Sequence, residues 1–375
     1  MTAPAPAAPA GAADLRHTLR HLVTHLLTPV LMCLGMALAY QGAFHQPTPH
    51  HLQVAVVGRS PQAAQLAAGL QAKAGPALDV RTLPDRAVAE QQLRDRTLTG
   101  AYLVDDGTGR APSPELLVAS ASSATSATAV EDVFQQVAAV QGAPLKVVDL
   151  VPTAPGDPTG QGLFFLLVAL SVGAYGSVAV LGTAGAALGV RGRAAVGVAT
   201  ALVISVIGIV TAGPVFHVVD HDYAAIWALA WLYATGIVLL GIGLHTFLKR
   251  WTTLTLMVLF VMLNFTSSGG IFRPELQPGL FGGLHRFWNG AGFVEGARSI
   301  LYFDGGAGLG GRVLSLVGWL VAGLLALAGA AWVERRRAAA LGTTADRAAG
   351  AAAEAAGAED VAEDVMEEEE QALAV

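Results

Sequence analysis

Long apolar runs alternate with one extended polar region along this 375-residue chain. Each run is close to or above the roughly 20 residues that a helix needs to cross a hydrocarbon core about 30 Å thick. We therefore predict six membrane spans, over residues 22–44, 162–188, 194–216, 224–245, 247–265 and 312–333. Pro29 lies inside the first run, and a membrane helix tolerates it where neighbours satisfy the freed carbonyl.

The residues before the first span have their own pattern. Residues 1–13 are rich in Ala and Pro and lack the charged start of a signal peptide, so we do not expect the first span to be cleaved. "DLRHTLRHLVTHLL" (14–27) has apolar and basic positions at helical spacing, which is typical of a helix in the membrane interface. We assign residues 1–21 to a cytoplasmic N-terminus that includes this helix.

Residues 45–160 show short-period patterns in place of long apolar runs. Short alternating or apolar runs predict strands, and runs that are amphipathic at the helical period predict helices. The predicted order is β-α-β-α-β-β-α-β, over "LQVAVVG" (52–58), "PQAAQLAAGLQAKAG" (61–75), "LDVRTL" (78–83), "DRAVAEQQLRDR" (85–96), "GAYLVDD" (100–106), "ELLVASA" (115–121), "TAVEDVFQQVAAVQG" (128–142) and "LKVVDLV" (145–151). These residues describe a small external α/β domain with one modest core.

Between the fifth and sixth spans, residues 267–303 are apolar but are broken every few residues by Gly or Pro. Backbone at membrane depth must be helical or shielded by protein. We predict two short amphipathic helices, near 274–287 and 290–303, that dip into the outer leaflet and return, with residues 267–270 as a hinge. Four aromatic residues are expected to cap an apolar cavity at its outer end: Phe281, Phe287, Trp288 and Phe293. Arg286 and Arg298 are expected at headgroup level.

Composition agrees with a membrane protein, because 53% of the residues are hydrophobic and only 13% are charged. The formal charge of −6 is uneven, since residues 338–375 hold ten acids and one Arg and leave the rest of the chain at about +3. That Ala- and Glu-rich end cannot bury enough apolar surface to offset its ordering entropy, so residues 334–375 are predicted to be an acidic disordered cytoplasmic tail. Cys33 is the single cysteine, which excludes an intrachain disulfide.

Basic residues beside the spans predict the orientation of the chain. They lie before span 1, between spans 2 and 3, between spans 4 and 5, and after span 6: Arg16 and Arg20, Arg191 and Arg193, Lys249 and Arg250, and residues 335–337. All four clusters fall on one side of a six-span order, which predicts cytoplasmic N and C termini. The expected fold is an α-helical polytopic membrane protein with a small external α/β domain between spans 1 and 2 and a five-span membrane domain over 161–333. Few Lys and much Ala and Gly indicate a GC-rich bacterial genome, and hence the bacterial plasma membrane.

Candidate chemistry is sparse. No Gly-x-x-x-x-Gly-Lys-Ser/Thr occurs, so the chain cannot hydrolyse ATP through a P-loop. The predicted spans carry almost no ionisable groups, which disfavours ion-coupled transport, and no nucleophile motif indicates an enzyme. Two groups have metal-ligand residue types, His17, His21 and His25 on one helix face, and His217, Asp220, His221 and Asp222 in a short turn. A plain polar surface is favoured for both, and no metal is expected.

Several short motifs in this layout are similar to those of a known family. "VAVVG" (54–58) and "AVAEQQLRDRTLTGAYLV" (87–104) lie in the external domain, and Gly269-Gly270, "PELQPGLF" (274–281) and "GFVEGARSILYFDG" (292–305) lie before the last span. Together with one span, an external domain and five further spans, they resemble the permease of an ABC type-2 exporter. The resemblance covers about residues 14–333 and is to the branch that includes the phage infection protein family.

The resemblance implies a permease subunit that moves an apolar or amphipathic substrate. It would work as a homodimer, or as a heterodimer with a similar permease, and use ATP through a separate cytoplasmic ABC ATPase. Membrane lipid is the other expected partner, and nucleic acid is not expected. Implied ATPase-coupling residues are Arg16, Arg20, Arg191 and Arg193; gate residues are Gly269, Gly270, Pro274, Pro278, Phe281, Trp288, Glu295 and Arg298. The alternative is a non-transporting membrane-anchored surface receptor or secretion-associated scaffold whose external domain binds a partner.

Overall fold

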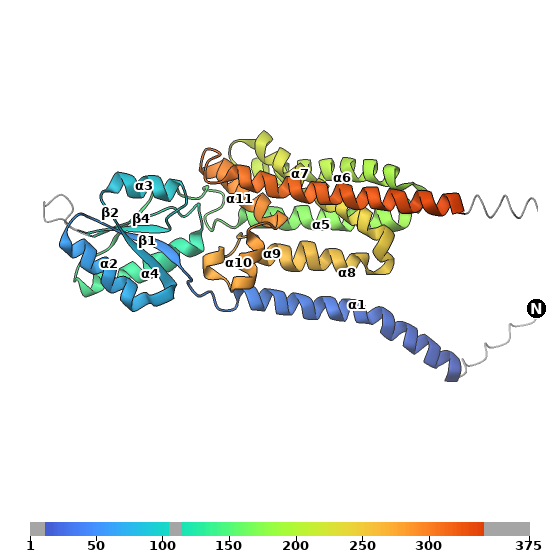
Figure 1. Ribbon diagram of the computed structural model, residues 1–375, viewed down its shortest axis with the longest axis horizontal. Helices are drawn as coiled ribbons and strands as arrows, with labels where there is room; N and C mark the ends of the chain where they lie inside the picture. The colour runs from blue at the N-terminus through green and yellow to red at the C-terminus, as the bar shows by residue number, and fades with distance from the viewer. Residues whose placement is uncertain (1–11, 105–113, 341–375) are drawn as a thin grey trace, which may run out of the picture.

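The computed structural model describes residues 12–104 and 114–340, without the side chains of residues 12–16, 25 and 186. The predicted acidic tail beyond residue 340 and the first eleven residues lie outside this part. Figure 1 shows a sheet domain and an elongated helical body placed end to end. The sheet domain is inserted after the first long helix, as the sequence predicts.

The sheet domain follows the predicted order β-α-β-α-β-β-α-β, which is confirmed. Its strands are β1 (Leu52–Val57), β2 (Leu78–Leu83), β3 (Gly100–Leu103), β4 (Glu115–Val118) and β5 (Lys146–Asp149). Its helices are α2 (Pro61–Ala74), the short 3-10 helix η1 (Gly75–Ala77), α3 (Arg86–Arg94) and α4 (Ala124–Val140). The side chains of Ser60, Asp85 and Ser123 accept backbone N–H groups at the starts of α2, α3 and α4, and these caps explain where the helices begin.

The strands form one mixed sheet in the order β2-β1-β3-β4-β5. Only the β3–β4 pair is antiparallel among the described strand pairs. Helix α3 covers one face, and α2 and α4 cover the other (Figure 1). Along β1, Val54 and Val56 pack toward α2 and α4, whereas Ala55 and Val57 pack toward α3. This burial on both faces explains why β1 is apolar at successive positions.

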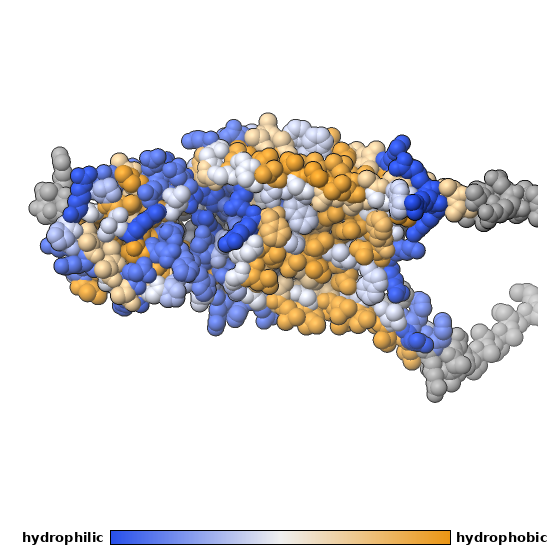
Figure 2. Space-filling view, viewed as in Figure 1, coloured by the Kyte–Doolittle hydropathy of each residue, from blue (hydrophilic) through white to orange (hydrophobic). Residues whose placement is uncertain are grey.

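Within the described residues, five segments of the helical body are long and apolar enough to span a membrane. They are His17–Phe44, Gly162–Thr183, Val190–Val215, Tyr223–Ser267 and Leu309–Ala340. Figure 2 shows apolar side chains along the sides of the body, and more polar ones over the sheet domain and at the far end of the body. This distribution fits a multi-pass membrane protein.

Several elements build these segments. They are α1 (Ala12–Phe44), α5 (Gly162–Thr183), the 3-10 helix η2 (Ala184–Ala187), α6 (Val190–Val210), the π-helix η3 (Thr211–Val215), α7 (Tyr223–Leu248), the 3-10 helix η4 (Lys249–Trp251), α8 (Thr252–Met257), the π-helix η5 (Val258–Leu263), α9 (Asn264–Ser267) and the final helix Leu309–Ala340. Helices α5, α6 and α7 surround the main core, which includes Leu167, Ile237 and Phe260. The final helix packs on α7 through Gly243.

The 45-residue segment Tyr223–Ser267 folds back on itself. Helix α7 ends at Leu248, and the next residue, Lys249, has a φ of 48°, outside the right-handed helical region. Asn264 Nδ2 donates to Tyr233 Oη at 2.7 Å, although the two residues are 31 positions apart. On one straight helix they would be separated by about 46 Å, since the rise is about 1.5 Å per residue. The chain therefore reverses at η4, between the stretches predicted as separate spans.

Helix α1 is continuous from Ala12 to Phe44. The expected interfacial helix over 14–27 is therefore not a separate element. Pro29 lies inside α1 and lacks the backbone donor that an α-helix uses, and Figure 1 shows α1 bending along its length. Much of the apolar surface of α1 is exposed in this single chain, including Val30 and Leu34.

Residues 267–303, which we call the connector, contain the 3-10 helix η6 (Pro274–Leu276), α10 (Gly279–His285) and α11 (Asn289–Tyr302). The predicted helix over 274–287 is broken, because the backbone of Gln277 and Pro278 is extended. The helix predicted near 290–303 is present as α11. In Figure 1 the connector lies at the end of the body that faces the sheet domain.

Candidate functional site

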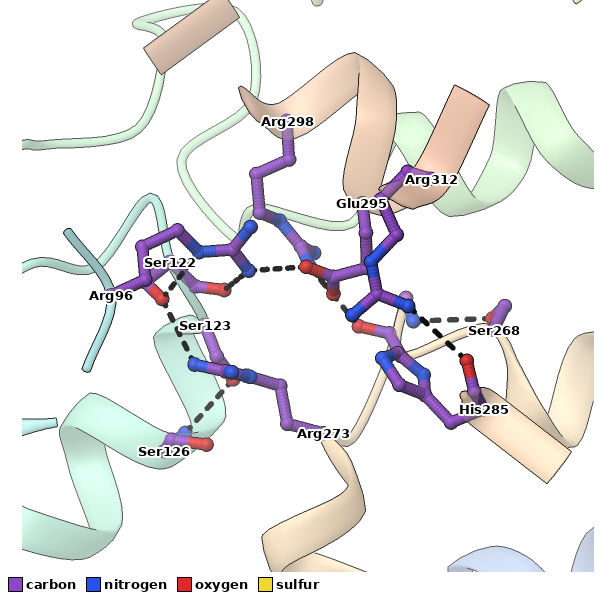
Figure 3. A network of polar contacts seen from close by, with 12 residues as sticks. Arg96, Ser122, Ser123, Ser126, Ser268, Arg273, His285, Glu295, Arg298 and Arg312 are labelled. Carbon is purple, nitrogen blue, oxygen red and sulfur yellow. Dashed lines mark hydrogen bonds and ion pairs between the residues drawn. The ribbon is translucent and has the colours of Figure 1, made fainter. Parts of the chain in front are cut away.

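A buried carboxylate lies where the sheet domain meets the helical body (Figure 3). Glu295 projects from α11, and its side chain is only 2% exposed. Arg96 of the sheet domain forms an ion pair with Oε2, and Arg298 Nη1 donates to Oε1 at 2.7 Å. The two arginine side chains are 5% and 4% exposed. Separating charges at this depth would leave an uncompensated buried ion, so the contact fixes how the two parts meet.

The backbone at the end of α3 positions Arg96. Thr97 N donates to Gln92 O at 3.0 Å, and Arg96 N donates to Leu93 O at 3.1 Å, which is the Schellman pattern. Arg96 occupies the left-handed position of this motif, with φ 59°. Glycine is the usual residue there because it has no Cβ. An arginine at this position directs a guanidinium away from the sheet domain and toward Glu295.

A third guanidinium ties the connector to the sheet domain. Arg273 Nη1 and Arg96 Nε each donate to Ser122 Oγ at 3.1 Å, so one hydroxyl receives a donor from each part. Arg273 also forms an ion pair with Glu275 at 3.4 Å. Figure 3 shows the side chains of Arg96 and Arg298 pointing toward Glu295, and that of Arg273 pointing toward Ser122.

The turn before η6 is packed tightly against this cluster. Gly269 has φ +74°, and a Cβ there would lie 2.7 Å from His285 Cε1 and 3.0 Å from Glu295 Oε1. A Cβ on Gly270 would lie 2.7 Å from the Phe164 side chain. His285 Nδ1 bonds to Ser267 O at 2.9 Å, and Arg298 Nη1 donates to Gly269 O at 3.3 Å. The predicted hinge is thus a packed turn, in which both glycines allow close approach.

Burial and neighbouring charges set the ionisation of the cluster, which lies outside the five apolar segments. Burial alone would raise the pKa of Glu295, but Arg96, Arg298 and Arg273 outweigh it and hold that pKa well below the usual range. Burial lowers the pKa of His285 to about 4, so the ring is neutral near pH 7. Burial also lowers the pKa of Arg96 to about 10, so this side chain is still a cation near pH 7.

Apolar contacts join the same parts. Phe272 and Leu276 of the connector pack into the core of the sheet domain with α2 and α4. Phe303 packs against Ala119 and Val151 of the sheet domain, and the Arg96 guanidinium lies 5.3 Å from its ring centroid. The connector therefore contributes side chains both to the body and to the domain.

A buried polar chain continues from the connector into the body. Gly290 N donates to Asn264 Oδ1 at 2.7 Å, Asn264 Nδ2 donates to Tyr233 Oη, and Tyr233 Oη lies 2.5 Å from Ser171 Oγ. These contacts link α11, α9, α7 and α5. Each of these buried polar groups needs its partner in place, because an unpaired polar group in an apolar environment costs free energy.

The structure places the predicted gate residues at several sites. Glu295 and Arg298 lie in the charge cluster, Pro274 begins η6, and Pro278 precedes α10. The guanidinium of Arg298 is buried against Glu295, whereas Arg286 is exposed. The expectation that both arginines lie at headgroup level stays a prediction.

The four predicted aromatic residues differ in their surroundings. Phe281 and Phe293 are buried, and Phe287 is 55% exposed. Trp288 packs on Trp319 of the final helix, with ring centroids 5.2 Å apart, and donates to Leu259 O at 3.0 Å. Trp288 therefore fastens the connector to neighbouring helices.

The predicted coupling residues lie at the end of the body far from the sheet domain. Arg193 is buried in an ion pair with Glu334 of the final helix, and Glu334 Oε2 also accepts Val190 N at 3.1 Å. Arg191 and Arg20 are exposed, and the Arg16 side chain lies outside the described part. Of the two arginines in the first turn of α6, Arg191 is the one accessible to a partner.

The histidine groups show no convergent metal geometry within the described residues, where no set of three His, Cys, Asp or Glu side chains is close enough to hold an ion. His221 Nδ1 lies 2.6 Å from Asp220 Oδ1, and its other ring nitrogen lies 3.8 Å from Asp222. His17 and His21 stack along α1, with ring centroids 6.4 Å apart.

Sequence reasoning missed the sheet-domain half of the cluster. Arg96 and Ser122 lie in segments that read as an ordinary helix end and an ordinary loop, and 199 positions separate Arg96 from Glu295. One signal was present, since an arginine immediately after a helix occupies a position that commonly belongs to glycine. His285 carried no comparable signal.

Comparisons with known proteins identify no relative. No family model matches the chain, and no curated protein and no solved structure is similar to it at a significant level.

Proposed function

We propose that this chain is a membrane permease subunit, specifically of an ABC type-2 exporter powered by a separate cytoplasmic ATPase. The observation that supports the proposal most is the buried Arg96–Glu295 ion pair, which joins the external domain to the short helices before the last apolar segment. Motion of those helices would necessarily be transmitted to the domain, as an exporter with an external domain requires.

The proposal includes six membrane crossings. The reversal at η4 supports counting Tyr223–Ser267 as two crossings, one by α7 and one by α8, η5 and α9 together. The basic residues support a cytoplasmic assignment for the end of the body that is far from the sheet domain. The sheet domain then lies outside the bacterial plasma membrane, and both termini lie in the cytoplasm.

The buried polar chain suggests a route between the two ends. An ATPase that moved the exposed turn before α6 would shift α6 against α5 and α7. The Ser171–Tyr233–Asn264 chain would carry that shift to Gly290 at the start of α11. Glu295, further along α11, would then pull on Arg96 and the sheet domain.

The surface of the body supports an apolar or amphipathic substrate. The described membrane-facing helices offer apolar side chains over most of their length (Figure 2). Two permeases would form a homodimer or a heterodimer around the transport path, and the exposed apolar side chains of α1 would meet lipid or the second permease. ATP would enter only through the partner subunit.

A surface receptor or scaffold is the second candidate. The sheet domain is firmly attached to the helical body. This attachment also suits a receptor in which binding of a partner to the domain changes the arrangement of the membrane helices. The two candidates differ in their need for an ATPase.

Affinity purification from the native bacterial membrane in mild detergent separates these candidates. We expect an ABC ATPase subunit to co-purify in a fixed ratio to the chain and to be lost under conditions that dissociate the complex. Recovery of secretion or surface proteins without any ATPase would favour the scaffold and contradict the permease.

A further inference from the structure

A second site lies at the opposite end of the body from the charge cluster. A cavity of about 530 Å³ is formed between α1 and the η4 turn. Arg20 and Thr24 line it from α1, and Arg250 and Trp251 line it from η4. Its volume lies in the range of small-molecule and headgroup sites.

The lining has a clear gradient of polarity. Arg20 and the histidine rings of His17 and His21 line the cavity from the first part of α1, and Leu27 lies about two turns further along the helix. Val30, Leu34 and Leu38 further along α1 are exposed and apolar. A ligand that fits this gradient has an anionic head and an apolar tail.

The positive charge of the site is not balanced by an acid among the described residues of its lining. A second cavity of about 360 Å³ lies on the other side of η4, shares Arg250 and adds Lys249 and His245. Among the described residues that line the two cavities, there is no Asp or Glu. The Arg250 guanidinium carbon lies 5.3 Å from the Trp251 ring centroid, so the two lining side chains contact each other.

The position of the aromatic ring suits a membrane interface. Trp251 is exposed at the turn between two apolar helices, and tryptophan rings concentrate where a membrane helix meets the headgroups. Basic pockets between membrane helices bind acidic lipid headgroups, through their phosphates. We propose that the cavity between α1 and η4 binds the phosphodiester headgroup of an anionic phospholipid, with its acyl chains along the apolar face of α1.

The proposed lipid site requires that the chain spans a membrane, and it does not require that the chain transports a substrate. It also gives Arg20 a different contact from the ATPase surface proposed above, because the guanidinium faces the lipid cavity. A bound lipid would bridge α1 to the α7–α8 turn, two elements whose described side chains form a cavity here.

Native mass spectrometry of the full chain in detergent provides the test. Three probes are added separately: phosphatidylglycerol, phosphatidylcholine and inorganic phosphate. We expect phosphatidylglycerol to remain bound and phosphatidylcholine to dissociate. The double variant Arg20→Gln/Arg250→Gln should weaken phosphatidylglycerol binding by about thirtyfold, since each cation near the membrane surface contributes about a fivefold effect.

Arg286→Gln is the matched control, because Arg286 is exposed on the connector at the other end of the body. It should leave lipid binding unchanged. Equal retention of the two lipids, or full retention by the double variant, would overturn the site. Displacement of phosphatidylglycerol by millimolar inorganic phosphate would show a free-phosphate site and overturn the lipid assignment. The proposed ATPase interaction is measured separately, so either idea can fail alone.

Discussion

At the scale of single residues, Arg96 determines how the sheet domain is attached. Its backbone adopts a conformation that favours glycine, and its side chain neutralises part of the buried charge of Glu295. Local backbone preference and long-range electrostatics therefore oppose each other at this position. The presence of arginine indicates that the contact with Glu295 is the stronger requirement.

We predict that Arg96→Gly lowers the unfolding free energy by about 2–4 kcal/mol, since removing one partner of a buried pair costs more than the relief of a positive φ returns. The shift in thermal unfolding midpoint, followed by tryptophan fluorescence, measures the change. Arg59→Ala, which removes an exposed ion pair to Asp85, is the control and should cost less than about 1 kcal/mol. An Arg96→Gly protein as stable as wild type would show that the ion pair does not hold the parts together.

A pH dependence follows from His285. In the unfolded chain its pKa is the usual 6.5, and burial lowers the folded value to about 4. The unfolded state therefore binds more protons between these values, so stability is full above pH 6.5 and falls as pH drops toward 4. Glu295, whose folded pKa is also depressed, adds to the loss below about pH 4.5.

The unfolding midpoint of wild type and of His285→Gln, measured from pH 7.5 to 5, tests this dependence. Glutamine keeps a donor for Ser267 O but does not titrate. The variant should lose less stability over this range, where the histidine contributes up to about 1.4 kcal/mol per pH unit. Parallel curves for the two proteins would exclude His285 as the source.

At the scale of elements, much of the sheet domain could be predicted from sequence, because each strand and helix has a local period. The pattern of β1, apolar on both faces, and the amphipathic spacing of α3 are properties of short stretches. The connector was harder to predict, since Phe272 and Leu276 pack into the domain and Trp288 packs against the body. No local period carries that information.

The same limit applies to two charged residues of the predicted sites. Arg298 follows Glu295 by three positions, so their pairing was visible, but its burial depends on Arg96 and the Gly269 turn, which are distant in sequence. Arg193 was expected to face a partner and instead pairs with Glu334, 141 positions away. Contacts between segments distant in the sequence therefore decide which charged side chains are buried and which stay accessible to a partner.

An element-scale prediction concerns the turn before α6 together with the first turn of that helix, which carries Arg191. Arg191→Glu should reduce the amount of ATPase that co-purifies with the chain by about tenfold or more, because it reverses an exposed charge at the proposed contact. Arg286→Glu, an equal charge change at the other end of the body, is the control and should retain the ATPase. Equal ATPase recovery from both variants would remove this turn from the coupling surface.

At the scale of the whole molecule, orientation across the membrane can be tested by thiol labelling. In a Cys33→Ala background, single cysteines at Val140 and Asp220 should react with an impermeant reagent in whole cells, and one at Arg191 should not. Val140 is 90% exposed, which makes it a suitable reporter, whereas Ser122 is buried between Arg96 and Arg273. External labelling at Arg191, confirmed by comparison with lysed cells, would contradict the six-crossing arrangement.

The central claim is that this chain couples to an ATPase. The most direct measurement is the ATP hydrolysis rate of the purified partner ATPase, alone and with this chain in lipid nanodiscs. We predict a rate several-fold higher with the wild-type chain and a rate close to that of the ATPase alone with Arg191→Glu. An ATPase whose hydrolysis rate is the same with and without the chain would contradict the account.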